Sequence, residues 1–434
     1  MRRLPALALV ALASLSPRPG FADGALQAPP PLTLREAQDF ALAHHPQIQA
    51  ADLRAQAAAK VVIEARAGYL PQVAGTATAA AAGTNTRIAA SGALNNPSVF
   101  QRESNGLVLS QLLTDFGRTS SLTASARYQA ESATDTTEAI RARVLLDVDH
   151  AFLDVLGARA VLNVALQTVS ARQLLLDRVT ALATAKLKSS LDQSFAEVSL
   201  GEARLLLLRA QDELQSAQAR LAAAMGLRDP LPRELADVPL SSTPPSEVDG
   251  IVQQALATRP ELRAARAQRE AAERLAAAER AARYPVVSAV AAAGVSPYHD
   301  ARLDDTYSAA GVVLTVPVFT GGRLSARAQE AGLQAGASQK ALDDAENQVE
   351  RDVRVAWLAA RTALQAIDVT HATLESASRA LDLAQSRYDL GISSIVELSQ
   401  AQLQKTQADI NDAVARYDYQ RRRADLDFAT GVLR

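Results

Sequence analysis

Side chains that could carry out catalysis are few and scattered in this sequence. Its five histidines are His44, His45, His150, His299 and His371. Only two of them are adjacent, and adjacent residues on a helix do not share a face, whereas a metal site needs three or four converging ligands. There is no cysteine and no glycine-rich phosphate loop of the Walker type. We therefore expect no enzyme: no catalytic, cofactor-binding or metal-binding residue, with the histidine pair at a solvated helix end.

A different polar group surrounds a short interruption in a long helical pattern. The stretch RYDLGISSIVELSQAQLQ, residues 387–404, lies in a segment without proline that runs from 318 to 434. Gly391 can adopt a positive φ at little cost, so it suits a turn between two helices. A lone carboxylate, Glu397, follows the turn, where the dipole of a beginning helix favours an acidic residue.

The elements around this turn are repeated within the chain. Pro46 and Pro71 match Pro260 and Pro285, in both cases at an offset of 214. Self-similarity of this kind indicates a duplicated architecture. We therefore expect residues 23–229 and 249–434 to form two copies of one unit, joined by a linker at 230–248.

Further along, the repeat continues at an offset of 205. The segment LLTDFGRTSSLTASA matches PVFTGGRLSARAQEA, and Lys186 and Asp192 then correspond to Gly391 and Glu397. The nine residues by which the two offsets differ belong to the stretch between about 82 and 105, because loops tolerate insertions.

Each copy begins with a helix and continues with two strands. We expect the helices at about 33–68 and 249–283, the first with a capping box formed by Thr33 and Glu36. A proline ends each helix, and segments such as LPQVAGTATA then alternate apolar with polar residues, as a strand with one wet face does. The strands could also form a small soluble hairpin beneath the helices.

Long helices follow each pair of strands. A helix from Arg118 to about Lys186 would span on the order of 100 Å, too long for a compact domain. Two heptad seams favour coiled-coil packing, although a generic coiled-coil rod would have the same pattern. The seams are Leu374, Ala377, Leu381, Ala384 and Tyr388, then Val396, Ser399, Leu403, Thr406, Ile410, Ala413 and Tyr417.

The amino-terminal residues indicate export. Arg2 and Arg3 precede an apolar run from 4 to 15 and a small-residue site at Ala22, so residues 1–22 read as a signal peptide. A run of this length is too short to span a bilayer, which takes about 20 residues, and we expect no transmembrane helix elsewhere. The net charge of −2 argues against nucleic acid as a partner.

The duplicated order of helix, strands and helical hairpin resembles the TolC-like outer-membrane factors, the outer membrane efflux protein family. The resemblance is carried by LTLREAQDFALAHHPQIQAA and its copy, by YLPQV and YPVV, by VPVFTGGR and by SRYDLGISSIVELSQAQ. It implies a mainly α fold with membrane β structure. An internally duplicated coiled-coil α-barrel reaches into the periplasm, and four strands per protomer contribute to a 12-stranded barrel in the outer membrane of a homotrimer.

This resemblance implies an outer-membrane channel of a tripartite efflux pump or a type I secretion system. Such a channel is a passive exit duct for small molecules or polypeptides. It needs no cofactor, and its partners are outer-membrane lipid, a periplasmic adaptor (membrane fusion protein) and an inner-membrane transporter. The alternative is an exported periplasmic coiled-coil adaptor or structural protein, which would contain one hairpin rather than two.

Site residues follow from the same resemblance. The turns would be hairpin tips that dock onto partners, with Lys186, Ser189, Gly391 and Ser393. The periplasmic entrance would be lined by Asp192, Glu397 and Gln400, the two acids forming a cation-selective ring in the trimer, as charged rings do in channels. Tyr388 resembles a tyrosine that latches neighbouring coiled coils shut. The same two acids are also ordinary first-turn residues.

Aromatic residues stand at all four junctions between helix and strand. They are Tyr69, Phe116, Tyr284 and Phe319. Aromatic residues are enriched at membrane interfaces, so these would form one girdle of the barrel, although aromatics also end strands by chance.

Overall fold

The computed structural model describes residues 30–81, 83, 101–229, 233–240, 247–301 and 303–433. The expected signal peptide at 1–22 lies outside them. The elements are α1 Leu34–His44, α2 Pro46–Ala67, β1 Gln72–Ala80, β2 Arg102–Thr114, α3 Arg118–Thr184, α4 Ser190–Ala224, α5 Val248–Thr258, α6 Pro260–Ala281, β3 Val286–His299, β4 Thr306–Thr315, α7 Arg323–Asp389 and α8 Ile395–Ala429. The two halves therefore contain the same elements in the same order.

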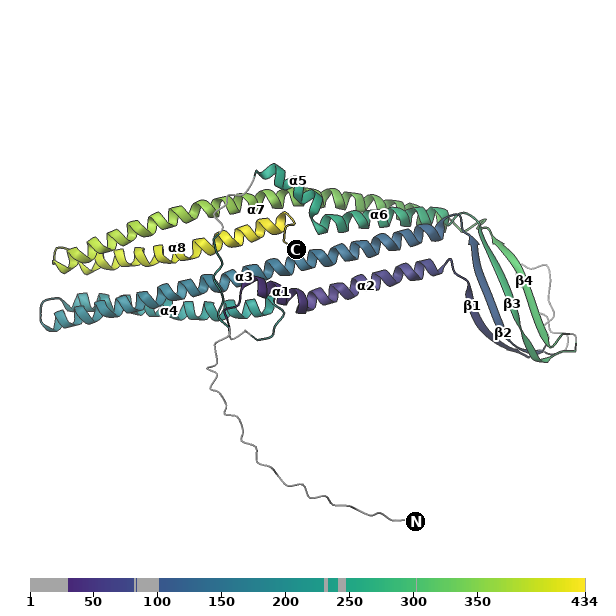
Figure 1. Ribbon diagram of the computed structural model, residues 1–434, viewed down its shortest axis with the longest axis horizontal. Helices are drawn as coiled ribbons and strands as arrows, with labels where there is room; N and C mark the ends of the chain where they lie inside the picture. The colour runs from purple at the N-terminus through teal and green to yellow at the C-terminus, as the bar shows by residue number, and fades with distance from the viewer. Residues whose placement is uncertain are drawn as a thin grey trace, which may run out of the picture.

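The molecule is elongated, with its helices running along the long axis (Figure 1). The four strands lie together at one end, and the turns α3–α4 and α7–α8 lie side by side at the other. Two helices of 67 residues, α3 and α7, connect the two ends. At 1.5 Å per residue each is about 100 Å long, as the proline-free segments predicted.

The first helix of each copy is broken, contrary to the prediction of single helices at 33–68 and 249–283. His45 and Arg259 are extended, with ψ of 125° and 127°, and separate α1 from α2 and α5 from α6. Each precedes a proline, whose ring disfavours the helical conformation of the residue before it. Proline then occupies the first position of the next helix, where its missing N–H costs nothing.

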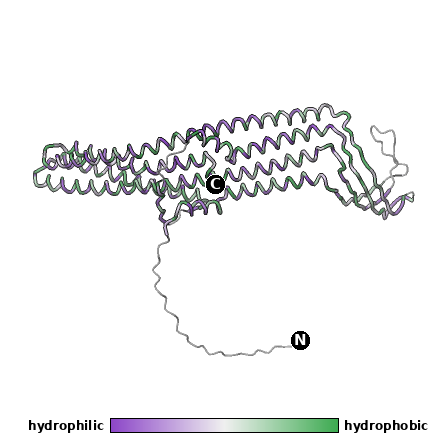
Figure 2. Tube along the Cα trace, turned by 45° about the horizontal axis from the view of Figure 1, so that its top comes forward, coloured by the Kyte–Doolittle hydropathy of each residue, from purple (hydrophilic) through white to green (hydrophobic). Residues whose placement is uncertain are grey.

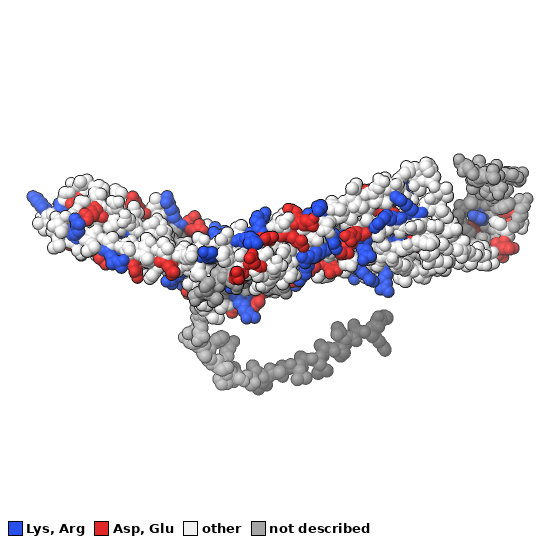
Figure 3. Space-filling view, turned by 90° about the horizontal axis from the view of Figure 1, so that it is seen from above, with Lys and Arg blue, Asp and Glu red and all other residues white. Residues whose placement is uncertain are grey.

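One antiparallel sheet contains all four strands, in the order β1-β2-β3-β4. This order excludes the alternative of a small hairpin beneath the helices, since β2 pairs with β3 across the two copies. The strands carry mostly hydrophobic residues, whereas the helices are mixed (Figure 2). Charged side chains cover the helical body and leave much of the surface over the strands uncharged (Figure 3).

The two faces of the sheet differ in polarity. The register places Val73 and Gly75 of β1 beside Leu109 and Leu107 of β2, on an apolar face that continues to Val312 of β4. The opposite face carries more hydroxyl and amide groups, together with aliphatic residues such as Val108 and Val290. Its polar residues are Gln72, Thr76, Thr78, Ser104, Ser110, Ser288 and Thr315. The alternation of apolar and polar residues predicted for β1 is therefore present in that strand, whereas β2, β3 and β4 carry apolar residues on both faces.

Helix α3 is the centre of the helical body. It packs against α2 and α6 near the sheet and against α4 and α8 near the turns. The largest core cluster gathers apolar residues of α1, α3 and α4, with Phe152 fully buried, and Leu235 and Val238 of the linker pack against it. The linker pairs with Leu32 through a short parallel bridge to Leu235, so the described part of the linker lies along the helices.

Helix α3 also contains an apolar window with a mean hydropathy of 1.3, which length and composition alone would allow to cross a membrane. The expectation that no such helix occurs is therefore wrong by that criterion. The same helix supplies most of the largest core cluster. About a third of the window is buried inside the protein, and a core helix of a soluble protein meets the same criterion, so one such helix is weak evidence for a span.

Candidate functional site

The two hairpin turns have the same backbone conformation. Gly391 has a φ of 75° and Lys186 a φ of 61°, both in the left-handed region, as their correspondence in the repeat predicted. The N–H groups of Leu187 and Ile392 bond back to the carbonyl oxygens of Leu182 and Arg387, at 2.9 and 3.0 Å. These bonds satisfy carbonyls at the ends of α3 and α7 and reverse the chain.

The next helices begin with serine caps. Ser189 Oγ accepts hydrogen bonds from the N–H groups of Leu191 and Asp192 at 3.1 and 3.3 Å. Ser394 caps α8 in the same way, accepting from Glu397 N–H at 3.3 Å. Ser393, which the sequence interpretation placed at the hairpin tip, precedes this cap, and its half-buried hydroxyl has no hydrogen-bond partner among the described residues. The offset of 205 would have identified the cap, because it pairs Ser189 with Ser394.

Each of the two predicted entrance carboxylates has a local partner. Asp192 accepts a hydrogen bond from Ser189 N–H at 3.2 Å and completes a capping box. Glu397 lies 3.5 Å from Arg387 at the end of α7. Both side chains stand in the first turn of their helices, so the capping interpretation holds. Only one carboxylate oxygen of Asp192 takes part in the cap, so the other can still interact with an ion or another side chain.

Tyr388 is buried between the two hairpins, with 1% of its surface exposed. Its hydroxyl has no hydrogen-bond partner among the described residues. Instead, Lys188 Nζ of the α3–α4 turn lies 3.9 Å from the centre of the ring, a cation–π contact. Burial raises the pKa of the Tyr388 hydroxyl, and the charges of Asp192 and Asp389 raise it further.

A second contact joins the same two hairpins. Arg178 of α3 lies 3.2 Å from Asp389 at the end of α7. Below these contacts, a core cluster unites the four helices: Leu175, Val179, Ala196, Ala384, Tyr388, Ile395, Leu398 and Ala401. Nothing in the sequence singled out Lys188, Arg178 or Asp389, because only the packing of the two hairpins brings them together.

Gln400 lies on the wall of a groove between α4 and α8, with α3 beneath. The predicted α8 seam, Val396, Ser399, Leu403, Thr406 and Ile410, lines this groove. Within the protomer, α8 packs through another set of residues, which includes Leu398, Ala401, Ala408, Ala415 and Tyr419. The seam on α8 therefore lines the groove and does not form the internal contact of the hairpin, whereas Ala384 and Tyr388 of the seam on α7 are buried.

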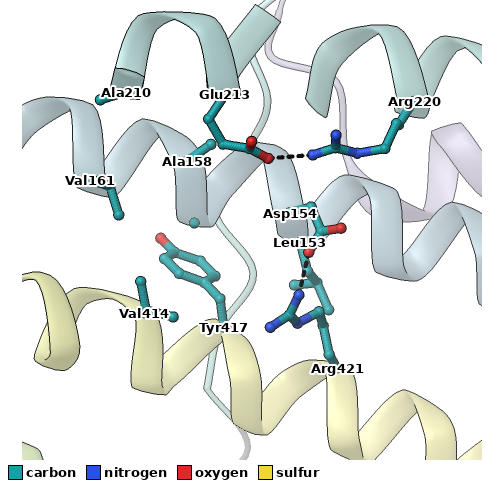
Figure 4. Close-up of a pocket in the computed structure, with 11 residues that line it drawn as sticks. Leu153, Asp154, Ala158, Val161, Ala210, Glu213, Arg220, Val414, Tyr417 and Arg421 are labelled. Carbon is teal, nitrogen blue, oxygen red and sulfur yellow. Dashed lines mark hydrogen bonds and ion pairs between the residues drawn. The ribbon is translucent and has the colours of Figure 1, made fainter. Parts of the chain in front are cut away.

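Further from the turns, another pocket lies between α3, α4 and α8. Tyr417 and Arg421 of α8 point toward α3, where Arg421 reaches Asp154 at 2.5 Å (Figure 4). Gly157 of α3 has no side chain, and Tyr417 packs beside it, 3.8 Å from the position that a Cβ would take. Contacts of α3 with α8 thus continue from the turns toward the middle of the molecule.

Buried ionisable groups gather near this middle region. Asp149 is 5% exposed and accepts a hydrogen bond from Gln38 Nε2 at 2.5 Å, and burial raises the pKa of its carboxyl to about 6. His150 Nε2 lies 3.0 Å from a carboxylate oxygen of Asp425, and this carboxylate raises the pKa of the imidazole. Both groups link α3 to other elements rather than facing a cavity.

No group of three or more metal-ligating side chains occurs among the described residues. Of the histidine pair, His45 is not solvated as expected. It is 9% exposed, its Nδ1 accepts a hydrogen bond from Gln47 N–H at 3.2 Å, and it caps α2. Burial lowers the pKa of its imidazole. His44 stacks on Phe40 instead.

The junction aromatics lie where helices meet strands. Phe116 and Tyr284 are close, with ring centroids 5.9 Å apart. All four side chains are exposed in the protomer, from 42% for Tyr69 to 88% for Phe319. They are therefore available for contact with a membrane interface.

The chain is similar to two curated proteins along most of its length. It is 27% identical over 391 residues to protein CyaE of Bordetella pertussis, covering 86% of this chain and 80% of that protein. It is also 27% identical over 379 residues to outer membrane protein OprJ of Pseudomonas aeruginosa, covering 85% and 78%.

A solved structure has the same fold. A membrane protein from Pseudomonas aeruginosa superposes with a TM-score of 0.81 at 25% identity, covering 92% of this chain and 90% of that one. The sequence profile of the family described as "Outer membrane efflux protein" matches residues 38–227 and 251–432, one match for each copy of the repeat. With both halves and nearly the whole described chain matched, this protein belongs to the outer membrane efflux protein family, whose members are channels of the outer membrane.

Proposed function

We propose that three copies of this chain form a passive duct that crosses the outer membrane and reaches through the periplasm. The observation that carries this proposal is the open four-stranded sheet, whose outer strands β1 and β4 pair with no further strand of the described residues on one side. Unpaired strand edges are not tolerated in lipid, and closed barrels have about eight strands or more. Three sheets of four strands would close a 12-stranded barrel.

The polarity of the sheet fits this arrangement. Its apolar face would meet lipid, and its face with hydroxyl groups would line the water-filled interior, as in other transmembrane barrels. Tyr69, Phe116, Tyr284 and Phe319 would form the girdle at the periplasmic side of the membrane. Strands of 9–14 residues are long enough, because a tilted transmembrane strand takes about 9–11.

We propose that the duct serves a tripartite efflux pump or a type I secretion system and has no enzymatic activity. The hairpin tips would dock onto a periplasmic adaptor beside an inner-membrane transporter. Exposed apolar side chains support a docking role: Leu187 and Leu191 at one tip, Leu390 and Ile392 at the other. The two hairpins and membership in the family argue against the alternative of an adaptor.

At the periplasmic entrance, Asp192 and Glu397 would form a ring of six carboxylates in a trimer, two from each copy. Gln400 would form a neutral second ring. Lys186 precedes Asp192 by six residues in the sequence, and Arg387 is in contact with Glu397. These two positive charges would partly neutralise the ring. Charged rings select ions of opposite sign, so the entrance would favour cations weakly.

Planar bilayers containing the purified protein test the entrance directly. We expect the double variant Asp192→Ala, Glu397→Ala to lose its preference for K⁺ over Cl⁻, measured as the reversal potential in a salt gradient. Lys186→Gln should shift the potential in the opposite direction, because it removes a positive charge from the same turn. Asp212→Ala, a change of an exposed acid on α4 far from the turn, serves as the control.

A reversal potential that is the same in the double variant and the wild type would refute the entrance assignment. Failure of the wild-type protein to form channels at all, or its recovery as a soluble periplasmic monomer, would instead refute the duct itself.

A further inference from the structure

The groove beside Gln400 combines an apolar surface with a buried positive charge, that of Arg172, and has one exposed acid, Glu202, on its α4 wall. Its volume is about 530 Å³, its floor is α3, and its walls are α4 and α8. The apolar side chains on the walls are Phe195, Val198, Leu206, Val396, Leu403 and Ile410. Binding sites for small molecules are commonly about 300–1,000 Å³ and mostly apolar, so the groove falls within the usual size.

Arg172 of α3 lies in this groove and is 7% exposed. No hydrogen bond or ion pair joins it to another residue in the part of the chain that the structure describes. Burial lowers the pKa of its guanidinium to about 10, against the opposing charge of Glu202 on α4. The side chain therefore remains a cation at neutral pH, and buried cations ordinarily have an ionic or hydrogen-bonded partner.

A second polar group in the groove also has no partner. Ser399 of α8 has a buried hydroxyl that makes no hydrogen bond to any described residue. A guanidinium presents several N–H donors in a plane and pairs with carboxylate, sulfate or sulfonate groups through two parallel bonds. A hydroxyl can add a third donor to such a group.

We propose that the groove binds an amphipathic organic anion. Its oxyanion head would pair with Arg172, with the Ser399 hydroxyl as a further donor, and its apolar body would lie against the walls of α4 and α8. This inference rests on the proposed duct function. It names a class of cargo that would pause on the wall beside Gln400, just inside the entrance.

Two probes of nearly the same shape separate the charge from the apolar surface. The dye 8-anilinonaphthalene-1-sulfonate carries a sulfonate, whereas N-phenyl-1-naphthylamine has the same rings without it. Both are titrated by fluorescence into the full-length protein in a non-ionic detergent, with the detergent alone as the blank. We expect the wild type to bind the sulfonate dye saturably and about tenfold or more tightly than the neutral dye.

Variants at Arg172 provide the decisive comparison. Arg172→Met should weaken binding of the sulfonate dye about tenfold or more and leave the neutral dye unchanged. Arg172→Lys should have an intermediate effect, because an ammonium keeps the charge but loses the paired geometry. Arg209→Met removes the same charge from an exposed position on α4 and should bind both dyes as the wild type does.

Equal affinity of the Arg172→Met and wild-type proteins for the sulfonate dye would overturn the proposal. It would also be overturned if the wild type binds no dye while Arg172→Met lowers the temperature at which the oligomer dissociates. That outcome would assign the guanidinium to an acidic side chain of a neighbouring copy. Either result leaves the conductance of the wild-type channel untouched, so failure of this inference is distinct from failure of the duct.

Discussion

At the scale of single residues, the two hairpin turns use different side chains for one backbone conformation. Glycine adopts a positive φ without strain, whereas a residue with a Cβ is strained there by roughly 1–2 kcal/mol. Gly391 therefore fits its turn, and Lys186 occupies the same conformation at a cost. Lys186 lies six residues before Asp192. It therefore gives this turn a positive charge that the turn with Gly391 lacks.

Another residue under constraint is Asp149, whose carboxyl has a pKa of about 6 in the folded protein, against 3.8 for an unperturbed aspartate. Between these pH values the folded state binds more protons than the unfolded state, so the free energy of unfolding falls as the pH rises. Above pH 7 the buried charge costs up to about 3 kcal/mol per protomer, from the difference of 2.2 units.

We therefore expect Asp149→Asn to raise the thermal unfolding midpoint at pH 8 and to have little effect at pH 4.5. The amide keeps an oxygen that can accept the hydrogen bond from Gln38, without the charge. Circular dichroism at 222 nm measures both midpoints. Asp147→Asn, a change of a more exposed acid on the same helix, is the control. A benefit of the same size at both pH values would contradict this account.

At the scale of elements, the sheet depends on two glycines that face a tyrosine. Gly294 of β3 pairs with Tyr307 of β4, and the Tyr307 ring extends over Gly106 of β2. A Cβ at Gly106 would lie 2.6 Å from the carbonyl oxygen of Ala293, closer than real contacts allow. Gly75 of β1 has no atom within 4 Å of that position.

This difference predicts that Gly106→Val prevents insertion, while Gly75→Val is tolerated although it makes the same change on the neighbouring strand. The clash at Gly106 involves backbone, which cannot move without breaking the pairing of β2 with β3. The amount of each variant in the outer-membrane fraction, compared by immunoblot, measures insertion. Wild-type amounts of Gly106→Val would show that the strands can separate enough to accept a side chain.

The contact between the two hairpins is a further property of elements. Lys188 and Arg178 belong to the first hairpin, and Tyr388 and Asp389 to the second. The ion pair is exposed and is worth at most about 1 kcal/mol, so the buried Tyr388 ring and the cation over it matter more.

We expect Lys188→Ala to loosen the contact between the tips and to raise the resting conductance in planar bilayers. Arg178→Ala should raise it less, because an exposed ion pair holds the hairpins more weakly. Lys405→Ala, a change of a lysine that pairs within α8, is the control. A larger effect from Arg178→Ala than from Lys188→Ala would mean that the ion pair, not the cation–π contact, joins the hairpins.

At the scale of the whole molecule, the free edges of β1 and β4 should meet between copies. The chain contains no cysteine, so a pair of introduced cysteines reports this contact without interference. Ala77→Cys on β1 combined with Ala310→Cys on β4 places both thiols on the apolar face. Disulfides form when Cα atoms are about 4.4–6.8 Å apart, so neighbouring positions on the same face should be scanned as well.

After oxidation, we expect a covalent trimer on a non-reducing gel for at least one pair in the scan. The single variant Ala77→Cys should give none, since identical positions of a closed ring do not lie side by side. A ladder that stops at dimers, or disulfides within one chain only, would be incompatible with a ring of three.

Much of this architecture was predictable because it depends on short stretches of sequence. The alternation in β1, the proline at each helix–strand junction and the glycine at the α7–α8 turn each act within a few residues. The matching prolines and the two matching segments at the starts of α3 and α7 revealed the duplication for the same reason. The break before Pro46 was missed because the uninterrupted alanine-rich pattern around it outweighed a local effect of proline on His45.

The sequence by itself determined the order of the strands and the long hairpin helices, the duplication and the resemblance to an outer-membrane duct. Only the tertiary structure decided which helix faces touch. It placed Lys188 over the ring of Tyr388 and turned the predicted seam on α8 toward the groove. It also buried Arg172 there without a partner among the described residues. Helical periodicity shows that a face is apolar, but the face it meets lies about 200 residues away and depends on how the whole helices pack.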